Sequence, residues 1–224
     1  MKSCWLSQNN SSNLIVFFAG WSFDETPFKT LSCEGFDVLF IYDYNEISEL
    51  EILKNISEKY EQKFLITWSM GVFVAAYLRK YFENFDKKIA INGTITPVDN
   101  EFGIPVKMFE LTLKHASVGL GGKFYKNVYK TEAEFEKYSQ NPVKRSIENR
   151  VSELENLYEF IKSNSVNGEK FYDFAVVSEY DKIIPPKNQI ASHKNFEVPI
   201  KIIESGHSPF FEFSKWKEIV DLCR

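Results

Sequence analysis

The stretch FLITWSMGVF, residues 64–73, joins a short apolar run to an apolar-periodic segment that continues to Phe82. The run at residues 64–68 predicts a buried strand, and the segment from Val72 predicts a helix. Ser69 stands at the corner between them, where a sharp turn would lift its hydroxyl above the sheet and beside the N–H groups that open the helix. This position predicts a serine nucleophile of the acyl-transfer type.

Apolar runs of the same kind recur along the chain and alternate with helical patterns. Several of them are continuously apolar, as strands covered on both faces must be. The alternation therefore predicts an α/β fold, with a mostly parallel central sheet flanked by helices. The predicted strands are residues 14–19, 37–42, 64–68, 89–92, 171–178 and 199–204. The predicted helices are residues 47–60, 70–85 and 213–223.

Residues 93–170 interrupt this rhythm, because a crossover between parallel strands needs only about a dozen residues. The later part, residues 131–161, is charged and carries apolar residues at helical spacing. We therefore expect a core formed by residues 1–92 and 171–224, with residues 93–170 inserted as a helical cap, or lid. Residues 101–150 hold nine Lys and Arg against six Glu, whereas the whole chain has a net charge of −4. This local excess of positive charge suits an acidic partner, although an ordinary solvated surface would explain it too.

The composition limits the class of protein. A chain of 224 residues, 44% of them hydrophobic, can bury one sizeable core. The three cysteines lie far apart without the spacing of a disulfide framework or a zinc site, which favours a reducing compartment. The first 13 residues lack the apolar core of a secretion signal, and no run approaches the roughly 20 apolar residues of a membrane span. We expect a cytoplasmic monomer that binds neither nucleic acid nor membrane.

A serine nucleophile needs a general base, and three histidines are available. His207 follows the predicted strand at 199–204 in a glycine-bearing loop, whereas His115 lies inside the insertion and His193 in a polar segment between strands. The elbow architecture orders its triad as serine, acid and then histidine along the chain. His207 is therefore the predicted base.

The acid that orients this histidine should follow the preceding strand. Asp181 occupies such a loop, in the segment SEYDKIIPP at residues 178–186, and is the predicted acid. Glu179, two residues away, and Asp99, which follows an earlier strand, are the alternatives. All of these candidates lie near the carboxyl ends of predicted strands, the edge where open α/β sheets place their sites.

An oxyanion hole needs two backbone donors. We expect one of them to be the N–H of Met70, the residue after the nucleophile. We expect the other to be the N–H of Trp21, because it follows the first strong strand and stands next to Gly20, which allows close approach of the backbone. The Trp21 indole is expected to form a wall of the substrate pocket.

These motifs together resemble the α/β-hydrolases over nearly the whole chain. More narrowly, the chain resembles the BioG-type esterases, which demethylate pimeloyl-acyl-carrier-protein methyl ester in biotin synthesis. The matching segments are residues 17–21, 42–44, 68–72, 92–94 and 102–105 together with the Asp181 loop. The resemblance implies a Ser69, Asp181 and His207 triad, a cap over the acyl chain, and a cytosolic enzyme that needs no metal or cofactor. Thr67 replaces the first glycine of the general G-x-S-x-G pattern, and BioG-type proteins are similar in using a small residue there.

The resemblance also implies an acyl-carrier protein as partner, and such carriers are acidic. The basic residues expected to meet it are Lys123, Lys126, Lys130, Lys144 and Arg145. Phe124 is a candidate for the lining of the acyl channel, although packing of a cap helix explains it equally well. Two other functions remain open. One is a thioesterase or small-ester hydrolase with the same triad, and the other is a non-catalytic module that binds a carrier protein.

Overall fold

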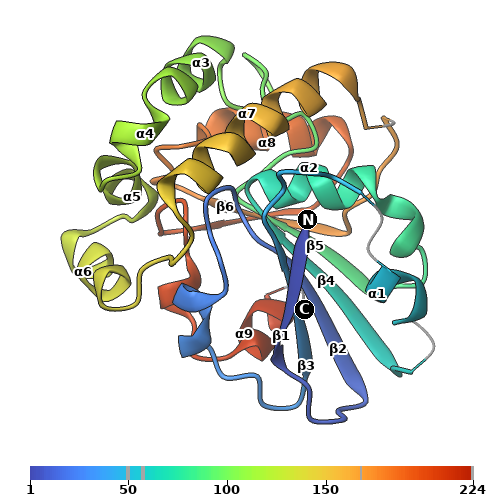
Figure 1. Ribbon diagram of the computed structural model, residues 1–224. Helices are drawn as coiled ribbons and strands as arrows, with labels where there is room; N and C mark the ends of the chain where they lie inside the picture. The colour runs from blue at the N-terminus through green and yellow to red at the C-terminus, as the bar shows by residue number, and fades with distance from the viewer. Residues whose placement is uncertain (49–50, 57–58, 167, 223–224) are drawn as a thin grey trace.

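The computed structural model describes residues 1–48, 51–56, 59–166 and 168–222 (Figure 1). Its centre is a seven-stranded sheet in the order β1-β3-β2-β4-β5-β6-β7. The strands are β1 (Lys2–Ser7), β2 (Asn13–Phe18), β3 (Asp37–Tyr42), β4 (Gln62–Trp68), β5 (Lys87–Ile91), β6 (Phe174–Ser178) and β7 (Ile200–Ile203). Neighbouring strands are parallel except β1, which pairs antiparallel with β3. The predicted mostly parallel α/β architecture is confirmed.

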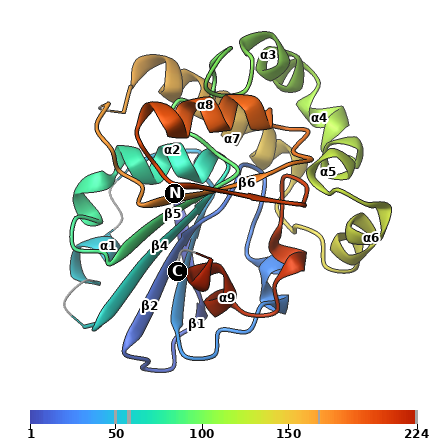
Figure 2. The ribbon, with the colours of Figure 1, turned by 180° about the vertical axis from the view of Figure 1, so that it is seen from behind.

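The buried strands follow directly from the apolar runs. Residues 14–18 are fully buried, and their side chains alternate between the two faces of the sheet. Phe17 packs against Phe40 on its own side of the sheet and against Trp216 of α9 (Trp216–Asp221). Phe18 points the other way and meets Phe82, just beyond α2 (Met70–Tyr77). Figure 2 accordingly shows α2 and α8 (Pro186–Asn195) on one side of the sheet and α9 on the other.

The first strand was not expected from the sequence. β1 lies at the edge of the sheet, and its residues are exposed or half-buried. An edge strand of this kind lacks the continuous apolar run by which buried parallel strands are recognised. The sequence pattern therefore gave no signal for it.

The predicted helices are longer than the observed ones. Helix α1 spans Glu51–Asn55 within the expected 47–60, of which residues 49–50 and 57–58 lie outside the described part. Helix α2 ends at Tyr77 and is followed by the 3-10 turn η2 (Arg79–Tyr81), although a helix was expected to continue to residue 85. The helix was predicted too long because Phe82 and Phe85 continue the apolar spacing. Both side chains are buried, but their backbone is not helical. Helix α9 is likewise shorter than the predicted 213–223, and residue 223 lies outside the described part.

Between β5 and β6 the chain forms a group of helices, here called the cap helices. They are α3 (Val106–Lys114), α4 (Ala116–Gly119), α5 (Lys123–Val128), α6 (Glu132–Gln140) and α7 (Ile147–Ser163). Thr131 and Glu134 form a capping box that begins α6, and the Ser146 side chain accepts from the Asn149 N–H to begin α7. In Figure 1, α3 to α6 form a row along one side of the molecule.

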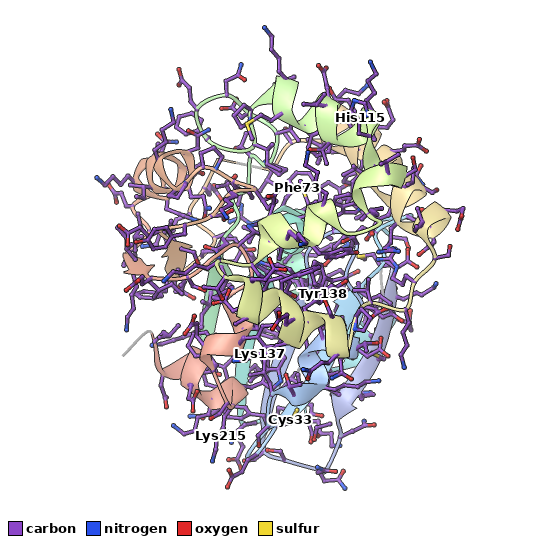
Figure 3. The ribbon with its side chains drawn as sticks, turned by 90° about the vertical axis from the view of Figure 1, so that its left-hand side faces the viewer. Cys33, Phe73, His115, Lys137, Tyr138 and Lys215 are labelled. Carbon is purple, nitrogen blue, oxygen red and sulfur yellow. The ribbon has the colours of Figure 1, made fainter. Side chains whose placement is uncertain are left out.

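The cap helices are anchored to the rest of the protein by aromatic side chains. Tyr138 of α6 is buried and stacks on Tyr125 of α5, and both rings approach Phe23 in the loop after β2. Its neighbour Lys137 is exposed (Figure 3). Phe160, near the end of α7, packs edge-on against Tyr77 of α2. The cap is thus packed on the core at both ends.

Candidate active site

Ser69 sits at the tight corner between β4 and α2, with φ 56° and ψ −123°. A positive φ is uncommon for a residue other than glycine and marks a constrained backbone. Two glycines make room for this corner. A Cβ on Gly71 would lie 2.5 Å from the Phe18 carbonyl oxygen, and one on Gly93 would lie 2.4 Å from the Ser69 carbonyl oxygen. The corner therefore has the geometry of a nucleophile elbow.

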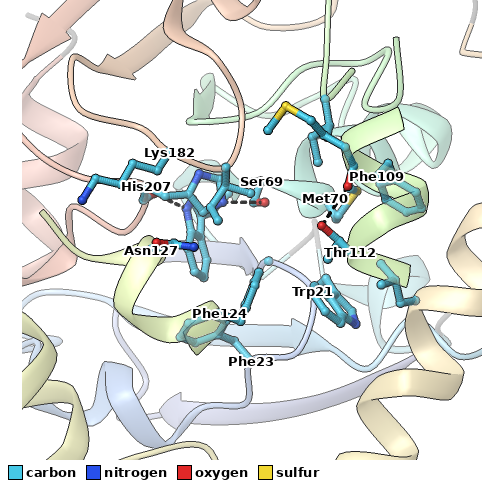
Figure 4. A pocket seen from close by; sticks show the side chains of 16 residues that line it. Trp21, Phe23, Ser69, Met70, Phe109, Thr112, Phe124, Asn127, Lys182 and His207 are labelled. Atoms are coloured by element: carbon cyan, nitrogen blue, oxygen red, sulfur yellow. Dashed lines mark hydrogen bonds between the residues drawn. The ribbon is translucent and has the colours of Figure 1, made fainter. Parts of the chain in front are cut away.

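The three residues predicted to act together are in direct contact. Figure 4 shows two of them, Ser69 and His207, joined by a dashed line. The His207 Nε2 atom lies 2.9 Å from the Ser69 Oγ atom. Its Nδ1 atom lies 2.8 Å from Asp181 Oδ2. All three residues are buried, so water competes little for these hydrogen bonds. A serine hydrogen-bonded to an imidazole that is itself held by a carboxylate is the arrangement of a catalytic triad.

Asp181 is fixed on both of its carboxylate oxygens. Oδ1 accepts hydrogen bonds from the backbone N–H groups of Ile183 and Ile184, at 2.8 and 2.9 Å. Oδ2 accepts from Gln189 Nε2 at 2.8 Å in addition to its contact with His207. Neither Gln189 nor the two isoleucine N–H groups was expected from the sequence, because residue type alone does not reveal which side chain supports an acid.

The alternative acids occupy other positions. Glu179 is exposed on the surface. Asp99 accepts hydrogen bonds from the backbone N–H groups of Glu101 and Phe102 and so stabilises its own loop. The geometry therefore favours Asp181 over both.

The loop that carries His207 is held from behind by side chains of the sheet. Trp68 Nε1 donates to the His207 carbonyl oxygen at 2.7 Å, and Asn92 Nδ2 donates to the same oxygen at 2.8 Å. The Asn92 Oδ1 atom accepts from the Ser178 N–H, which joins the loop to the end of β6. Asn92 was part of a matching segment but had no predicted role. The sequence feature that could have identified Asn92 is its position, as a polar residue directly after a buried strand.

The His207 loop also touches the cap. The Ser208 N–H donates to the Val128 carbonyl oxygen at 3.1 Å. A Cβ on Gly206 would lie 2.6 Å from the Lys130 backbone nitrogen, so only glycine fits at this point of contact.

The other two histidines lie elsewhere. His193 of α8 is buried, and its Nε2 atom lies 3.0 Å from the Gly93 carbonyl oxygen. Burial lowers the pKa of His193 to about 4, which keeps it neutral near pH 7. It therefore supports the segment behind the elbow from within the core. His115 is exposed at the end of α3.

The two residues predicted to supply the oxyanion hole line the same cavity. Met70 is the first residue of α2, where the N–H has no partner within the helix. Trp21 lies in the turn after β2. Both residues line a cavity of about 170 Å³ together with Ser69 and His207. The cavity thus brings the serine, the base and both predicted donor residues around one space.

The cavity walls are mainly apolar. Trp21 meets Phe124 of α5 edge-on with ring centroids 4.8 Å apart, and both residues line the cavity. Met108 and Phe109 of α3 and Leu154 of α7 are among the other apolar residues of the lining. Thr112, Asn127 and Lys182 add polar groups, and Figure 4 shows Asn127 and Lys182 on the His207 side. A space of this kind suits an aliphatic chain that carries a polar end.

A second depression adjoins this cavity and lies over α3, α4 and α5. It has a volume of about 560 Å³ and shares Trp21, Thr112, Phe124 and Asn127 with the inner cavity. We call it the outer groove. Its apolar wall includes Leu111 and Val118, which are 60% and 80% exposed. Lys123 lies in the same wall.

The basic residues predicted to meet a carrier protein differ in their surroundings. Lys123 is exposed and forms no ion pair with any other residue in the described ranges. Lys126 pairs with Glu132 at 3.2 Å, and Lys130 pairs with Glu204 at 2.7 Å.

Two further predicted contacts lie at the junction between the cap and the core. The Lys144 side chain is exposed, while its backbone N–H is bound to Asp24. Arg145 requires a correction. Its side chain is only 7% exposed and pairs with Glu153 at 2.8 Å and with Asp43 at 3.1 Å. The guanidinium is therefore used inside the molecule and is not available to a partner.

Among the residues that the structure describes, no group of three or more His, Cys, Asp or Glu side chains is placed to hold a metal ion. No helix there is both long and apolar enough to cross a membrane.

Comparison with solved structures shows the class of fold. An esterase from Exiguobacterium antarcticum superposes with a TM-score of 0.62 at 15% identity, covering 99% of this chain and 91% of that one. A lipase-esterase related protein from Clostridium acetobutylicum superposes with a TM-score of 0.63 at 16% identity, covering 99% and 97%. The chain therefore has the α/β-hydrolase fold.

The sequence comparisons identify the family within this class. The chain belongs to the pimeloyl-ACP methyl esterase BioG family, whose model matches residues 1–219. The crystal structure of BioG from Haemophilus influenzae superposes with a TM-score of 0.86 at 29% identity, covering 97% of this chain and 99% of that one. The predicted resemblance is confirmed. Family and fold together support an ester hydrolase.

One curated relative has a different name. The malonyl-[acyl-carrier protein] O-methyltransferase of Bacteroides fragilis is 30% identical over 198 residues, which is 86% of this chain. The matched region is only 39% of that relative, so this chain spans about two-fifths of its length.

Proposed function

We propose that this protein is a serine carboxylesterase that hydrolyses the methyl ester of pimeloyl-acyl-carrier protein, giving pimeloyl-acyl-carrier protein and methanol in biotin synthesis. The observation that carries the proposal is the hydrogen-bonded series Ser69, His207 and Asp181, which opens into an apolar cavity. Membership of the BioG family supports this substrate. The proposed chemistry uses only groups of the protein and water, and its proposed location is the cytoplasm, with the enzyme acting as a monomer.

The proposed reaction begins with attack of Ser69 Oγ on the ester carbonyl carbon while His207 Nε2 accepts the hydroxyl proton. The N–H groups of Trp21 and Met70 stabilise the oxyanion, and each such donor typically contributes about 2.7–4 kcal/mol. Collapse of this intermediate breaks the bond between the carbonyl carbon and the methoxy oxygen, and His207 gives its proton to that oxygen, which leaves as methanol. Water, deprotonated by His207, then cleaves the acyl-enzyme and restores Ser69. Asp181 stabilises the imidazolium in both steps.

The shape of the pocket also favours a long substrate that is attached to a carrier protein. The methyl ester has to lie beside Ser69, so the rest of the acyl chain and its carrier must extend away from the triad. The outer groove adjoins the inner cavity, shares four lining residues with it, and lies over α3, α4 and α5. We propose that residues 93–170 act as a cap that covers the acyl chain, and that Lys123 at the groove meets the acidic carrier.

The function is tested with purified pimeloyl-carrier-protein methyl ester and a matched unmodified acyl thioester of the same carrier. The expected result is release of methanol and a carrier that still holds the pimeloyl group as a free acid, detected by mass, while the plain thioester stays intact. Cleavage of the thioester would indicate a thioesterase, and cleavage of small esters alone would indicate a small-ester hydrolase. Binding of the carrier without any turnover, and without labelling by a fluorophosphonate, would indicate a non-catalytic module.

Reversal of charge at Lys123 tests the carrier contact. Lys123→Glu is expected to raise KM for the carrier-linked ester by about tenfold at low salt, because it places a negative charge where an acidic partner docks. The kcat/KM for a small methyl ester should stay unchanged. Lys137→Glu is the matched control, since Lys137 is also exposed on a cap helix but lies outside the lining of the groove. Equal effects of the two reversals would contradict the proposed docking site.

A further inference from the structure

The turn that carries the predicted oxyanion donor Trp21 has an unusual backbone. Its next residue, Ser22, has a φ of 74°, and its side chain and backbone are fully buried. A serine does not adopt this conformation readily, so the surrounding structure has to hold it. We call residues 19–24 the oxyanion turn.

A carboxylate from the cap holds this turn. Glu153 of α7 is fully buried, and its Oε2 atom accepts a hydrogen bond from the Ser22 N–H at 3.1 Å. Its Oε1 atom accepts from the Tyr44 N–H at 2.8 Å. The Tyr44 hydroxyl in turn donates to the Ala19 carbonyl oxygen at 2.7 Å. One side chain therefore links the strained residue of the turn to the segment after β3, and through Tyr44 to the start of the same turn.

The charge of this buried carboxylate is balanced. Arg145 lies 2.8 Å from Glu153 Oε2 and also reaches Asp43 at 3.1 Å. Burial raises the pKa of Glu153, whereas Arg145 and the two backbone donors favour its charged form. Arg145, whose side chain was expected on the surface, thus balances the negative charge of Glu153, which accepts a hydrogen bond from the oxyanion turn.

The cap makes two more contacts to the same turn. The Trp21 indole N–H donates to the Arg150 carbonyl oxygen of α7 at 2.7 Å. The Tyr125 hydroxyl of α5 donates to Ser22 Oγ at 3.2 Å, and it accepts from the Arg150 guanidinium. The side chains of Trp21 and Ser22, in the middle of the oxyanion turn, are therefore fixed by cap helices.

We propose that Glu153 is a positioning residue for the oxyanion hole, acting through its hydrogen bond to the Ser22 N–H to fix the adjacent Trp21 N–H toward the cavity. Glu153 does not line the cavity, so it acts without touching the substrate. The inference rests on the proposed esterase function. It makes α7 a part of the catalytic apparatus rather than only a cover over the acyl chain.

The test is Glu153→Gln, assayed on a small methyl ester that needs no carrier protein. Glutamine keeps the shape of the side chain but has one acceptor oxygen, so its NH2 group must face either the Ser22 N–H and Arg145 or the Tyr44 N–H. The expected result is a 10- to 100-fold fall in kcat with a change in KM of less than about threefold. Affinity for a trifluoromethyl ketone, whose adduct places an oxyanion in the hole, should fall by the same factor as kcat. Affinity for the carboxylate product should not change.

Two further variants separate positioning from folding. Tyr125→Phe removes the contact to Ser22 Oγ and the acceptor for the Arg150 guanidinium but leaves the Glu153 and Arg145 pair in place, and it is expected to lower kcat in the same direction by a smaller factor. Glu155→Gln, at an exposed position of α7, is the matched control and should match the wild type. Thermal unfolding establishes the folded fraction of each variant. A folded Glu153→Gln protein with wild-type kcat and ketone affinity would overturn the proposal.

The same assay distinguishes this inference from the proposed substrate. A wild-type protein that cleaves the small ester but not the carrier-linked ester would refute the substrate and still measure the effect of Glu153. A wild-type protein that cleaves neither ester would refute both.

Discussion

Ser69→Ala is expected to lower kcat for the methyl ester by about 10⁵- to 10⁶-fold. The variant removes the only atom that can form the acyl-enzyme in the proposed mechanism, while His207, Asp181 and the oxyanion donors stay in place. The measurement is release of methanol by the wild type and the variant, at equal concentrations of folded protein. Labelling by a fluorophosphonate probe should be lost in the same variant.

The loss in the Ser69 variant has to come from chemistry and not from the fold. Alanine fits the space of the serine, so circular dichroism and carrier-protein binding should match those of the wild type. Residual turnover above about 1% of the wild-type rate would show that another group acts as the nucleophile, or that water attacks the ester directly.

Asp181→Asn is expected to lower kcat by about 10³- to 10⁴-fold. The carboxylate accepts four hydrogen bonds, from two backbone N–H groups, Gln189 and His207. An asparagine must direct its NH2 group either at the backbone donors or at Gln189 and His207. An NH2 group that faces His207 would force the imidazole into the wrong tautomer. An NH2 group that faces the backbone donors would remove the hydrogen bonds that hold the Asp181 loop. The measurement is kcat on the methyl ester, with KM expected to change little.

Glu179→Gln is the matched control for the acid, because Glu179 lies two residues away on the same loop and is exposed. It should retain wild-type activity. A larger loss in Glu179→Gln, or in Asp99→Asn, than in Asp181→Asn would show that the acid has been assigned to the wrong residue.

The sequence predicted most of the sheet and the grouping of the triad candidates for a clear physical reason. Strands buried on both faces must be continuously apolar, and polar residues that directly follow such strands gather at one edge of a parallel sheet. Ser69 and Asp181 follow strands of this kind, β4 and β6. His207 follows the edge strand β7, which contains Lys201 and is exposed or half-buried, so the order of the candidates along the chain was needed to select it.

The contacts between cap and core could not be predicted in this way. Glu153 and Arg145 look like ordinary charged residues of a helical surface, and only the fold shows that they meet the turn after β2. The edge strand β1 was missed because it has no fully apolar run. Helix α2 was predicted too long because buried phenylalanines beyond it continue its apolar periodicity.

The order of the strands has a consequence for how the triad is assembled during folding. Strands β2 to β5 pair with one another using only residues before the cap, so the part of the sheet that positions Ser69 is formed from a short length of chain. Strand β6 pairs Val176 with Ile91 of β5, which closes a loop containing all five cap helices described between them. Longer loops cost more conformational entropy to close, and such pairings form later. We therefore expect Ser69, the proposed nucleophile, to be in place before Asp181 and His207, the proposed acid and base.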